Sequence, residues 1–212
     1  MEQRTVTLLG AGKMGAAMVT RWTAAGREVV VWSRTVAGAR ALSGPAVRAQ
    51  TDVTAAVTGA PVVVTSLTDG AAVRSVLLDR GALAAMEPGS TIVDLSTIDV
   101  ESSRAVAEAA QAKRVRYVRG AVSGTPAVVS AGNASLLLSG PRDALDAARD
   151  VLADITAKQT VVGAAEEARV VKLATNLMLA GTLQALAEAT VMAEARRNSS
   201  TPTPRRVQPT GG

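Results

Sequence analysis

The sequence predicts a doubly wound α/β fold, in which helices cover both faces of a mostly parallel sheet, followed by the start of an all-helical second domain. Short apolar runs alternate with helical patterns over residues 1–163, which is typical of strand–helix–strand units. The first apolar run leads directly into a glycine-rich turn, and a long apolar helical segment follows residue 163. We therefore expect a sheet domain over 1–163 and a long helix over 164–195.

The first half of the sheet domain contains four expected strands, at residues 6–9, 27–32, 47–49 and 61–67. The run 61–67 is apolar almost throughout, which is the pattern of a parallel strand covered on both faces. Helices are expected after the first and third of these strands, at 16–25 and 52–58.

The second half continues the alternation. Asp69 is a plausible N-cap for a helix that extends to about Leu78, and Glu87-Pro88-Gly89 predicts a turn. Further strands are expected at 91–95, 115–118 and 134–138, with helices at 99–112 and 142–154. Ligands of such sheets bind beyond the carboxyl ends of the strands. The residues expected at those ends are Gly10, Ser33, Ser66, Leu67, Ser96, Thr97, Ser123 and Gly124.

The turn after the first strand has the pattern G-x-G-x-x-G, formed by Gly10, Gly12 and Gly15 with Lys13 and Met14 inside it. Gly10 allows a tight turn, Gly12 lacks the Cβ that would block a pyrophosphate, and Gly15 lets the helix pack closely on its strand. The N-terminus of the helix then points free N–H groups at the phosphates. This context predicts a Rossmann-type dinucleotide site.

The end of the second strand favours one cofactor. A site for NAD commonly has Asp or Glu there, which binds the ribose 2′-hydroxyl, whereas this chain has Ser33-Arg34-Thr35. Arg34 can pair with a 2′-phosphate, and the two hydroxyls can donate to it. The sequence therefore favours NADP as the cofactor, with NAD possible; an ordinary solvated arginine is the alternative for Arg34.

Composition excludes several classes of site. The chain has no cysteine and no histidine, so disulfides, thiolate chemistry and the usual zinc ligands are absent, and no metal site is expected. With no Phe, one Tyr and two Trp, an aromatic nucleic-acid surface is not expected. Polar residues interrupt the apolar stretch 170–187, so we expect no membrane span and a soluble cytoplasmic protein.

The net charge of +5 comes mostly from the C-terminal tail. Residues 196–212 contain four arginines and no acidic residue, so the remaining chain is nearly neutral and does not indicate nucleic-acid binding. This tail is rich in Pro, Ser and Thr and lacks apolar periodicity, which predicts disorder.

Several motifs in order over residues 5–194 resemble the β-hydroxyacid dehydrogenases, a family that includes 3-hydroxyisobutyrate dehydrogenase and tartronate- and succinic-semialdehyde reductases. The motifs that carry the resemblance are Leu9-Gly10-Ala11-Gly12-Lys13-Met14-Gly15, Val31-Trp32-Ser33-Arg34-Thr35, Asp94-Leu95-Ser96-Thr97, Val122-Ser123-Gly124 and Lys172-Leu173-Ala174-Thr175-Asn176.

The resemblance implies an NADP-dependent oxidoreductase that interconverts a small 3-hydroxy acid and its semialdehyde or keto acid. It places Thr97 near the nicotinamide and makes Lys172 the acid/base. Because the chain has no histidine, a lysine is also the natural candidate on chemical grounds. Ser123 and Gly124 are then expected to bind the carboxylate of a small substrate. Asn176, four residues after Lys172 and on the same helix face, is expected to hold the substrate.

Three positions depart from the family pattern Asp-Ala-Pro-Val-Ser-Gly-Gly: Arg119 replaces the acidic residue, Ala121 the proline and Thr125 the second glycine. Arg119 is interpreted either as part of a solvated basic edge, together with Lys113, Arg114 and Arg116, or as a group that favours an acidic substrate. Thr125 is expected to narrow the carboxylate pocket.

The resemblance also implies a further helical half-domain after the Lys-x-x-x-Asn helix, so the helical domain is expected to be truncated. Apolar residues surround most of the segment 168–194, which predicts a homodimer through this helix. Two alternatives stay open: an imine reductase-like enzyme, and a catalytically silent NADP-binding oligomeric protein.

Overall fold

The computed structural model describes the backbone of residues 5–199 and the side chains of residues 5–196. The chain divides after Leu173 into two compact units, and each is described by itself. The first unit contains the whole sheet and the first two turns of the last helix, whereas the second consists of the remainder of that helix.

Strands and helices alternate through the first unit. In chain order they are β1 (Thr5–Leu9), α1 (Lys13–Ala24), β2 (Glu28–Trp32), α2 (Val36–Arg40), β3 (Val47–Gln50), α3 (Val53–Val57), β4 (Val62–Thr65), α4 (Gly70–Arg74), the π-helical turn η1 (Ser75–Asp79), α5 (Ala82–Ala85), β5 (Thr91–Asp94), α6 (Val100–Ala112), β6 (Arg116–Ser123), α7 (Pro126–Ser130), β7 (Ser135–Ser139), α8 (Arg142–Ile155), β8 (Gln159–Gly163) and α9 (Glu167–Ser199).

The strands form one sheet in the order β3-β2-β1-β4-β5-β6-β7-β8. All neighbours are parallel except β6 and β7, which pair antiparallel with Ala121 opposite Leu137. The chain order reverses direction between β1 and β4, so the crevice at the carboxyl ends of these strands is the place where an open α/β sheet binds ligands. The predicted doubly wound, mostly parallel sheet followed by a helix is confirmed.

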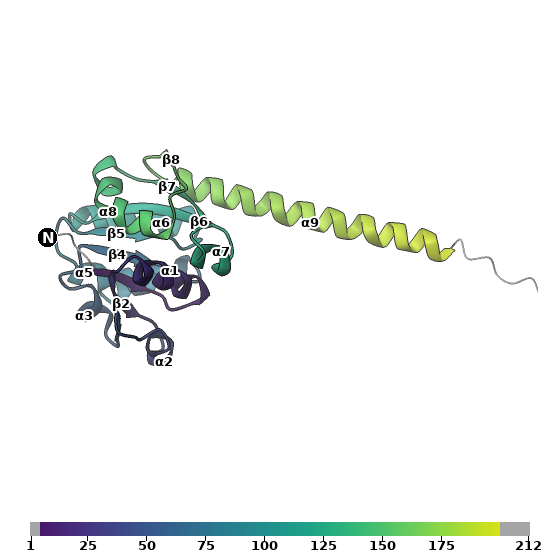
Figure 1. Ribbon diagram of the computed structural model, residues 1–212. Helices are drawn as coiled ribbons and strands as arrows, with labels where there is room; N and C mark the ends of the chain where they lie inside the picture. The colour runs from purple at the N-terminus through teal and green to yellow at the C-terminus, as the bar shows by residue number, and fades with distance from the viewer. Residues whose placement is uncertain (1–4, 200–212) are drawn as a thin grey trace, which may run out of the picture. The chain divides into compact units, whose positions relative to one another are not determined.

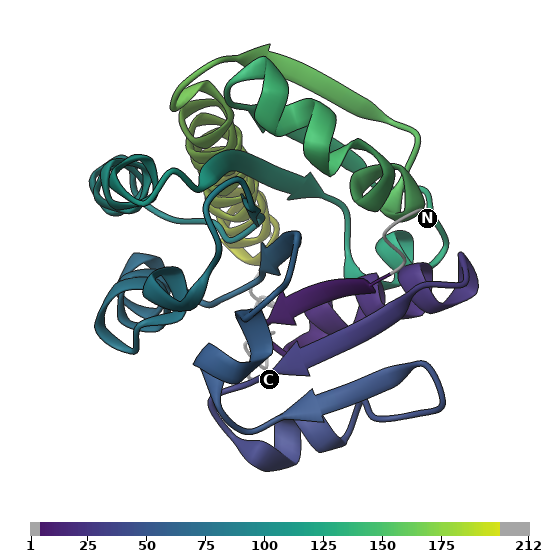
Figure 2. The same cartoon turned by 90° about the vertical axis from the view of Figure 1, so that its left-hand side faces the viewer.

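Helices cover the sheet from both sides (Figures 1 and 2), with α1 and α8 on one face and α6 on the other. The first core cluster lies under α1 and α8 and includes Trp22, Leu136 and Leu152, whereas the second lies under α3 to α6 and includes Trp32, Leu77 and Ile92. Because the strands are covered on both faces, β4 and β5 are buried at every position, as their continuous apolar runs predict.

Four elements and one strand direction were not expected from the sequence: α2, α5, α7, β8 and the antiparallel pairing of β6 with β7. The segment between β6 and β7 contains only the five-residue α7, which is too short to carry the chain across the sheet into a parallel strand. β8 is half-exposed at the edge of the sheet, so its short run Gln159–Gly163 lacks the apolar pattern of a central strand.

The last helix is longer than predicted. α9 extends from Glu167 to Ser199, so residues 196–199, which were assigned to a disordered tail, are helical. Residues 200–212, for which disorder was also predicted, lie outside the described residues.

Trp22 connects two helices on the same face of the sheet. Its side chain is fully buried and its Nε1 donates to Val151 O of α8 at 2.9 Å. Trp22→Ala should lower the free energy of unfolding by about 3–5 kcal/mol, because it leaves a cavity and an unpaired carbonyl. Trp22→Phe should lower it by about 1–3 kcal/mol, because only the hydrogen bond and a small volume are lost.

Urea unfolding followed by far-UV circular dichroism measures both changes without relying on tryptophan fluorescence. Val36→Ala is the control, since Val36 is 40% exposed and its truncation should change stability by no more than about 0.5 kcal/mol. Equal stability of Trp22→Ala and the parent would contradict this account of the α1–α8 contact.

Candidate active site

The glycine turn after β1 has the geometry of a phosphate-binding loop. Gly10 adopts φ +122°, and a Cβ there would lie 2.2 Å from Ser66 O. A Cβ on Gly15 would lie 2.1 Å from Gly10 O, so α1 approaches the turn too closely for a side chain. A Cβ on Gly12 would meet nothing within 4 Å, so this glycine faces open space. The geometry at each glycine is the one expected of it: a tight turn at Gly10, close helix packing at Gly15 and open space at Gly12; the binding of phosphate there stays a prediction.

The loops at the carboxyl ends continue the hydrogen-bonding pattern of the sheet. Gly10 N donates to Trp32 O at 2.8 Å, Ser66 N to Leu9 O at 3.0 Å and Leu95 N to Thr65 O at 3.0 Å. Each strand end is thus tied to its neighbour, which keeps the first residues of these loops at one edge of the sheet. Lys13 is exposed at the start of α1, and Met14 is partly buried against the first core cluster.

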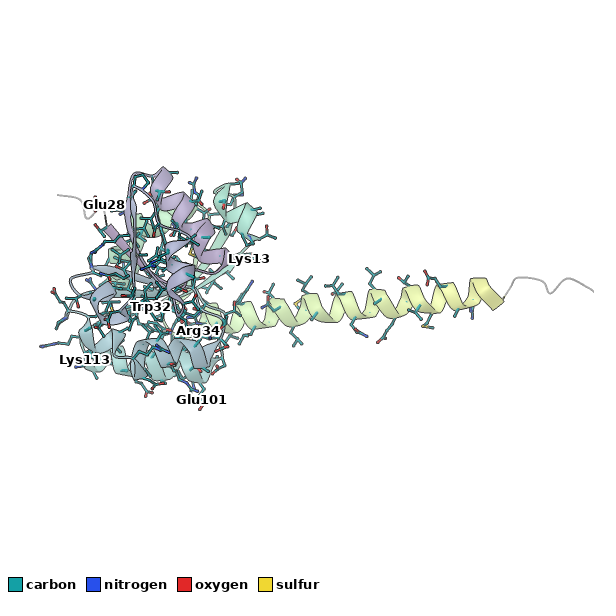
Figure 3. All side chains as sticks on the ribbon, turned by 90° about the horizontal axis from the view of Figure 1, so that it is seen from below. Lys13, Glu28, Trp32, Arg34, Glu101 and Lys113 are labelled. Carbon is teal, nitrogen blue, oxygen red and sulfur yellow. The ribbon has the colours of Figure 1, made fainter. Side chains whose placement is uncertain are left out.

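Two hydroxyls gather beyond the end of β2. A Cβ on Gly38 would lie 3.0 Å from Thr35 Oγ1 and 3.1 Å from Ser33 Oγ. Thr35 also caps α2 by accepting a hydrogen bond from Gly38 N at 3.3 Å. Arg34 is exposed, and it has no ion-pair partner among residues 5–196. Figure 3 labels Glu28, Trp32 and Arg34 along β2 and its exit; the three residues that follow the strand, Ser33-Arg34-Thr35, include no acidic residue.

The carboxylate of Asp94, at the end of β5, is fully buried and accepts four hydrogen bonds. Its Oδ1 accepts from Thr65 Oγ1 at 2.6 Å and from Ser96 N at 3.0 Å, and its Oδ2 accepts from Tyr117 Oη at 3.0 Å and Arg169 Nη2 at 2.6 Å. Burial, together with the charge of Asp94, raises the pKa of the Tyr117 hydroxyl well above its usual range, so it stays a proton donor.

The loops after β4 and β5 are joined by Ser96. Its hydroxyl accepts a hydrogen bond from Leu67 N at 2.9 Å. Ser96 itself is buried, whereas the next residue, Thr97, is exposed at the same edge. Ser66, Leu67 and Thr97 therefore come together, as the carboxyl-end rule predicts.

The end of β6 carries the predicted substrate residues. Ser123 and Gly124 are exposed, and Gly124 adopts φ +141°, a conformation that favours glycine. Thr125 is exposed, and its Oγ1 accepts from Val128 N at 3.4 Å and caps α7; the expectation that it narrows the carboxylate pocket stays a prediction.

Lys172 lies at this same strand end. It is half-buried, and its Nζ donates to Val122 O at 3.1 Å, one residue before Ser123. The structure thus brings the predicted acid/base to the predicted carboxylate-binding residues. Asn176 lies on α9 in the second unit, so its role stays a prediction.

Arg119 corrects both interpretations made from the sequence. It is neither solvated nor open to a substrate, because it is 8% exposed and its Nε donates to Glu166 Oε1 at 2.8 Å. Its guanidinium also lies over the ring of Tyr117, 4.9 Å from the centroid. Both residues of this pair line a pocket of about 730 Å³ between α6, β8 and the start of α9; apart from Arg119, no residue expected to bind the cofactor or the substrate lines it.

Sequence reasoning missed the roles of Asp94, Tyr117, Glu166 and Arg169. Asp94 was noted only as part of a motif, although an acidic residue at the end of an apolar, fully buried strand is itself a signal that a partner is required. Arg169 gave no such signal, because an arginine between Ala168 and Val170 also fits an exposed helix position.

α9 passes one test for a membrane helix. The segment Glu167–Arg196 is long and apolar enough to cross a membrane by length and composition, and a core helix of a soluble protein passes the same test. Among the described residues there is no cluster of His, Cys, Asp or Glu that could hold a metal ion.

The chain resembles known sequences over most of its length. Residues 5–163 match the family model described as the NAD binding domain of 6-phosphogluconate dehydrogenase. A probable 3-hydroxyisobutyrate dehydrogenase of Mycobacterium tuberculosis is 32% identical over 190 residues, which cover 90% of this chain and 64% of the relative. An NAD-dependent L-serine dehydrogenase of Pseudomonas aeruginosa is 32% identical over 212 residues, which cover 93% of this chain and 70% of the relative.

Solved structures of oxidoreductases also match this chain over most of its length. The M. tuberculosis 3-hydroxyisobutyrate dehydrogenase with L-serine matches with a TM-score of 0.84 and 31% identity, over 93% of this chain and 67% of that one. An imine reductase of Streptomyces aurantiacus matches with a TM-score of 0.82 and 29% identity, over 91% of this chain and 67% of that one. This chain thus spans about two thirds of the length of the proteins it matches. It belongs to the β-hydroxyacid dehydrogenase family, and residues 5–163 are its NAD(P)-binding domain.

Proposed function

We propose that this protein is an NADP-dependent oxidoreductase that interconverts a small 3-hydroxy acid and its semialdehyde or keto acid, with Lys172 as the acid/base. One observation carries the proposal: Lys172 Nζ lies 3.1 Å from Val122 O, beside Ser123 and at the same sheet edge as the glycine turn. The relatives named 3-hydroxyisobutyrate dehydrogenase and L-serine dehydrogenase support the substrate class.

Gly10, Gly12, Gly15 and Arg34 would hold the dinucleotide, which would supply the hydride chemistry between the alcohol carbon and the carbonyl. In the oxidation, the amine of Lys172 takes the hydroxyl proton of the substrate; in the reduction, its ammonium group gives that proton back. The hydrogen bond to Val122 O holds Nζ at the end of β6, so the proton is exchanged next to the substrate-binding residues.

Recognition of the substrate carboxylate is assigned to Ser123 and Gly124. The Ser123 hydroxyl and the Gly124 N–H are both exposed at the end of β6, and both can donate to a carboxylate. Asn176 is proposed to hold the substrate from α9. Thr97, at the end of β5, is proposed to lie near the nicotinamide.

The choice of NADP rests on the exit of β2. Arg34 is exposed and has no ion-pair partner within the described chain, and the hydroxyls of its neighbours Ser33 and Thr35 gather near Gly38, so these three residues offer a charge and two donors to a 2′-phosphate. Because the Pseudomonas relative is named NAD-dependent, NAD is the cofactor to compare.

A second candidate function is imine reduction, which the similarity to the S. aurantiacus imine reductase favours. The two activities differ in substrate, so assays with 3-hydroxy acids, semialdehydes and cyclic imines distinguish them. A third possibility, a catalytically silent NADP-binding protein, predicts cofactor binding without turnover of any of these compounds. We further propose a cytoplasmic location.

We also propose that α9 pairs with α9 of a second copy. In the second unit, seven large apolar side chains of this helix are exposed by more than half: Leu177, Met178, Leu179, Leu183, Leu186, Val191 and Met192. Apolar exposure on this scale marks an interaction surface, and a two-fold pairing covers the same surface on both copies.

Replacing Arg34 should reduce cofactor selectivity. Arg34→Ala should lower the affinity for NADPH about tenfold to a hundredfold and leave NADH affinity nearly unchanged, since a charge-assisted contact to the phosphate contributes about 1.5–3 kcal/mol. Fluorescence titration with both cofactors at one ionic strength measures this. Arg142→Ala is the matched control, because it removes the same charge from an arginine 95% exposed on α8. Equal NADPH and NADH affinity in the parent would refute the NADP assignment.

Replacing Lys172 should abolish chemistry without affecting cofactor binding. Lys172→Ala should lower kcat by at least about 10²-fold on the substrate that the parent converts, with the NADPH dissociation constant unchanged, because the lysine acts on the substrate. Lys158→Ala, an exposed lysine after α8, is the control. Undiminished turnover in Lys172→Ala would place the acid/base elsewhere.

Charges on α9 should prevent pairing. Light scattering on a sizing column should give the mass of a dimer for the parent and of a monomer for the double variant Leu183→Glu, Leu186→Glu, because burying two carboxylates per helix is unfavourable. Gln184→Glu adds a carboxylate at an exposed polar position between them and should stay dimeric. A monomeric parent at every concentration tested rules out this pairing.

A further inference from the structure

Arg169 is a fully buried arginine that the proposed chemistry does not use. It is 2% exposed, lies in the first turn of α9, and donates to four oxygens besides the Tyr117 hydroxyl. Nη1 donates to Ser96 O and, at 2.9 Å, to Gly120 O, whereas Nη2 donates to Asp94 O at 3.0 Å and Asp94 Oδ2 at 2.6 Å. Burial is the largest single influence and by itself would lower the pKa of this guanidinium, but Asp94, Tyr117 and Glu166 together outweigh it and raise that pKa.

The carbonyls that Arg169 and Lys172 bind belong to one stretch of β6. Arg116 N donates to Ser90 O, so the even-numbered residues of β6 direct their N–H and C=O groups toward β5. β5 ends at Asp94, opposite Arg119, and β6 continues to Ser123. The carbonyls of residues 120 and 122 therefore point to a side where no strand follows.

α9 supplies the missing donors in place of a strand. Arg169 donates to Gly120 O at 2.9 Å, and Lys172, one helical turn later, donates to Val122 O at 3.1 Å. The first turns of α9 are thereby fixed along the free part of β6. Of the two donors only Lys172 is half-exposed, so only Lys172 is available to a substrate, whereas Arg169 is enclosed.

Arg169 also connects this helix to the loop that follows β5. Arg169, Thr65 and Ser96 N all donate hydrogen bonds to the Asp94 carboxylate. Arg169 Nη1 also donates to Ser96 O. The Ser96 hydroxyl in turn accepts a hydrogen bond from Leu67 N. The side chain of Arg169 thus connects α9 to the end of β5, to the loop that follows β5 and to Gly120 of β6.

We infer that Arg169 is a positioning residue for Lys172: by binding Asp94 and the carbonyls of Ser96 and Gly120, it fixes the first turn of α9 against the end of β5, the loop that follows β5, and β6. This inference rests on the proposed role of Lys172 in catalysis, but the attachment of the helix can be measured without turnover. Removal of Arg169 is expected to free Lys172 from Val122 O and to misplace its amine relative to the cofactor loop.

The first measurement is the reactivity of individual lysines in the full chain. The protein has four lysines; Lys13, Lys113 and Lys158 are exposed, and Lys172 is half-buried. Brief acetylation with acetic anhydride, read per lysine by mass spectrometry, should label Lys172 severalfold faster in Arg169→Met than in the parent. The other three lysines should react at unchanged rates, which separates a local release of α9 from general unfolding.

The second measurement is the split between kcat and cofactor binding. Arg169→Met should lower kcat about 10²-fold while the NADPH dissociation constant stays within about twofold, because a displacement of about 1 Å of a catalytic group is sufficient for such a loss. Arg169→Lys keeps the charge beside Asp94 but cannot bind both carbonyls, so it should have intermediate values of kcat and of Lys172 labelling. Arg27→Met is the matched control: it breaks the ion pair with Asp154, outside the carboxyl-end loops, and should change neither measurement.

The outcomes distinguish this inference from the proposed function. If the parent has no turnover, the proposed function fails, and the labelling rates alone decide whether Arg169 holds the helix. If the parent is active and Arg169→Met keeps both parental kcat and slow labelling of Lys172, the inference is overturned and the proposed function stands. If circular dichroism shows that Arg169→Met does not fold, Arg169→Lys decides: parental values in both measurements overturn the inference.

Discussion

The buried carboxylate of Asp94 organises the carboxyl edge of this sheet. A carboxyl group with no exposure needs hydrogen-bond partners for its oxygens, and here four donors from two strands, one loop and one helix supply them. Because these donors come from the end of β4, the loop after β5, the start of β6 and the first turn of α9, satisfying one carboxylate holds all of these segments in place. The exposed residues of the candidate site lie next to the segments that donate hydrogen bonds to Asp94.

The unequal lengths of β5 and β6 decide how the last helix attaches. β6 extends beyond the end of its parallel neighbour β5, which leaves carbonyls of β6 without a partner in a strand. A buried carbonyl needs a hydrogen-bond donor. Arg169 and Lys172 provide those donors one helical turn apart. Arg169 is buried, whereas Lys172 is half-exposed at the edge of the sheet. The same local geometry thus serves both structure and the proposed chemistry.

The pair Arg119–Glu166 shows how a departure from a family motif is accommodated. An arginine stands where the motif has an acidic residue, and Glu166, just before α9, supplies the opposite charge at 2.8 Å. Burying such a pair contributes little net stability, but losing either partner would leave an uncompensated buried charge. The substitution therefore gives no information about the charge of the substrate, although it is the most conspicuous difference within the motif.

The sequence by itself determined the features that depend on neighbouring residues: the glycine turn, the alternation of buried strands and helices, and the gathering of Ser66, Thr97 and Ser123 at one edge. These follow from local backbone geometry and from the rule that parallel strands end on the same side. Only the tertiary structure decided the partners of Asp94, the burial of Arg119, the antiparallel β7 and the edge strand β8. Asp94 and Arg169 are 75 residues apart, and Arg119 and Glu166 are 47 apart. Contacts at such separations depend on strand lengths and register, which cannot be predicted from neighbouring residues alone. For this reason charged residues that the sequence indicates as solvated can be buried in the fold.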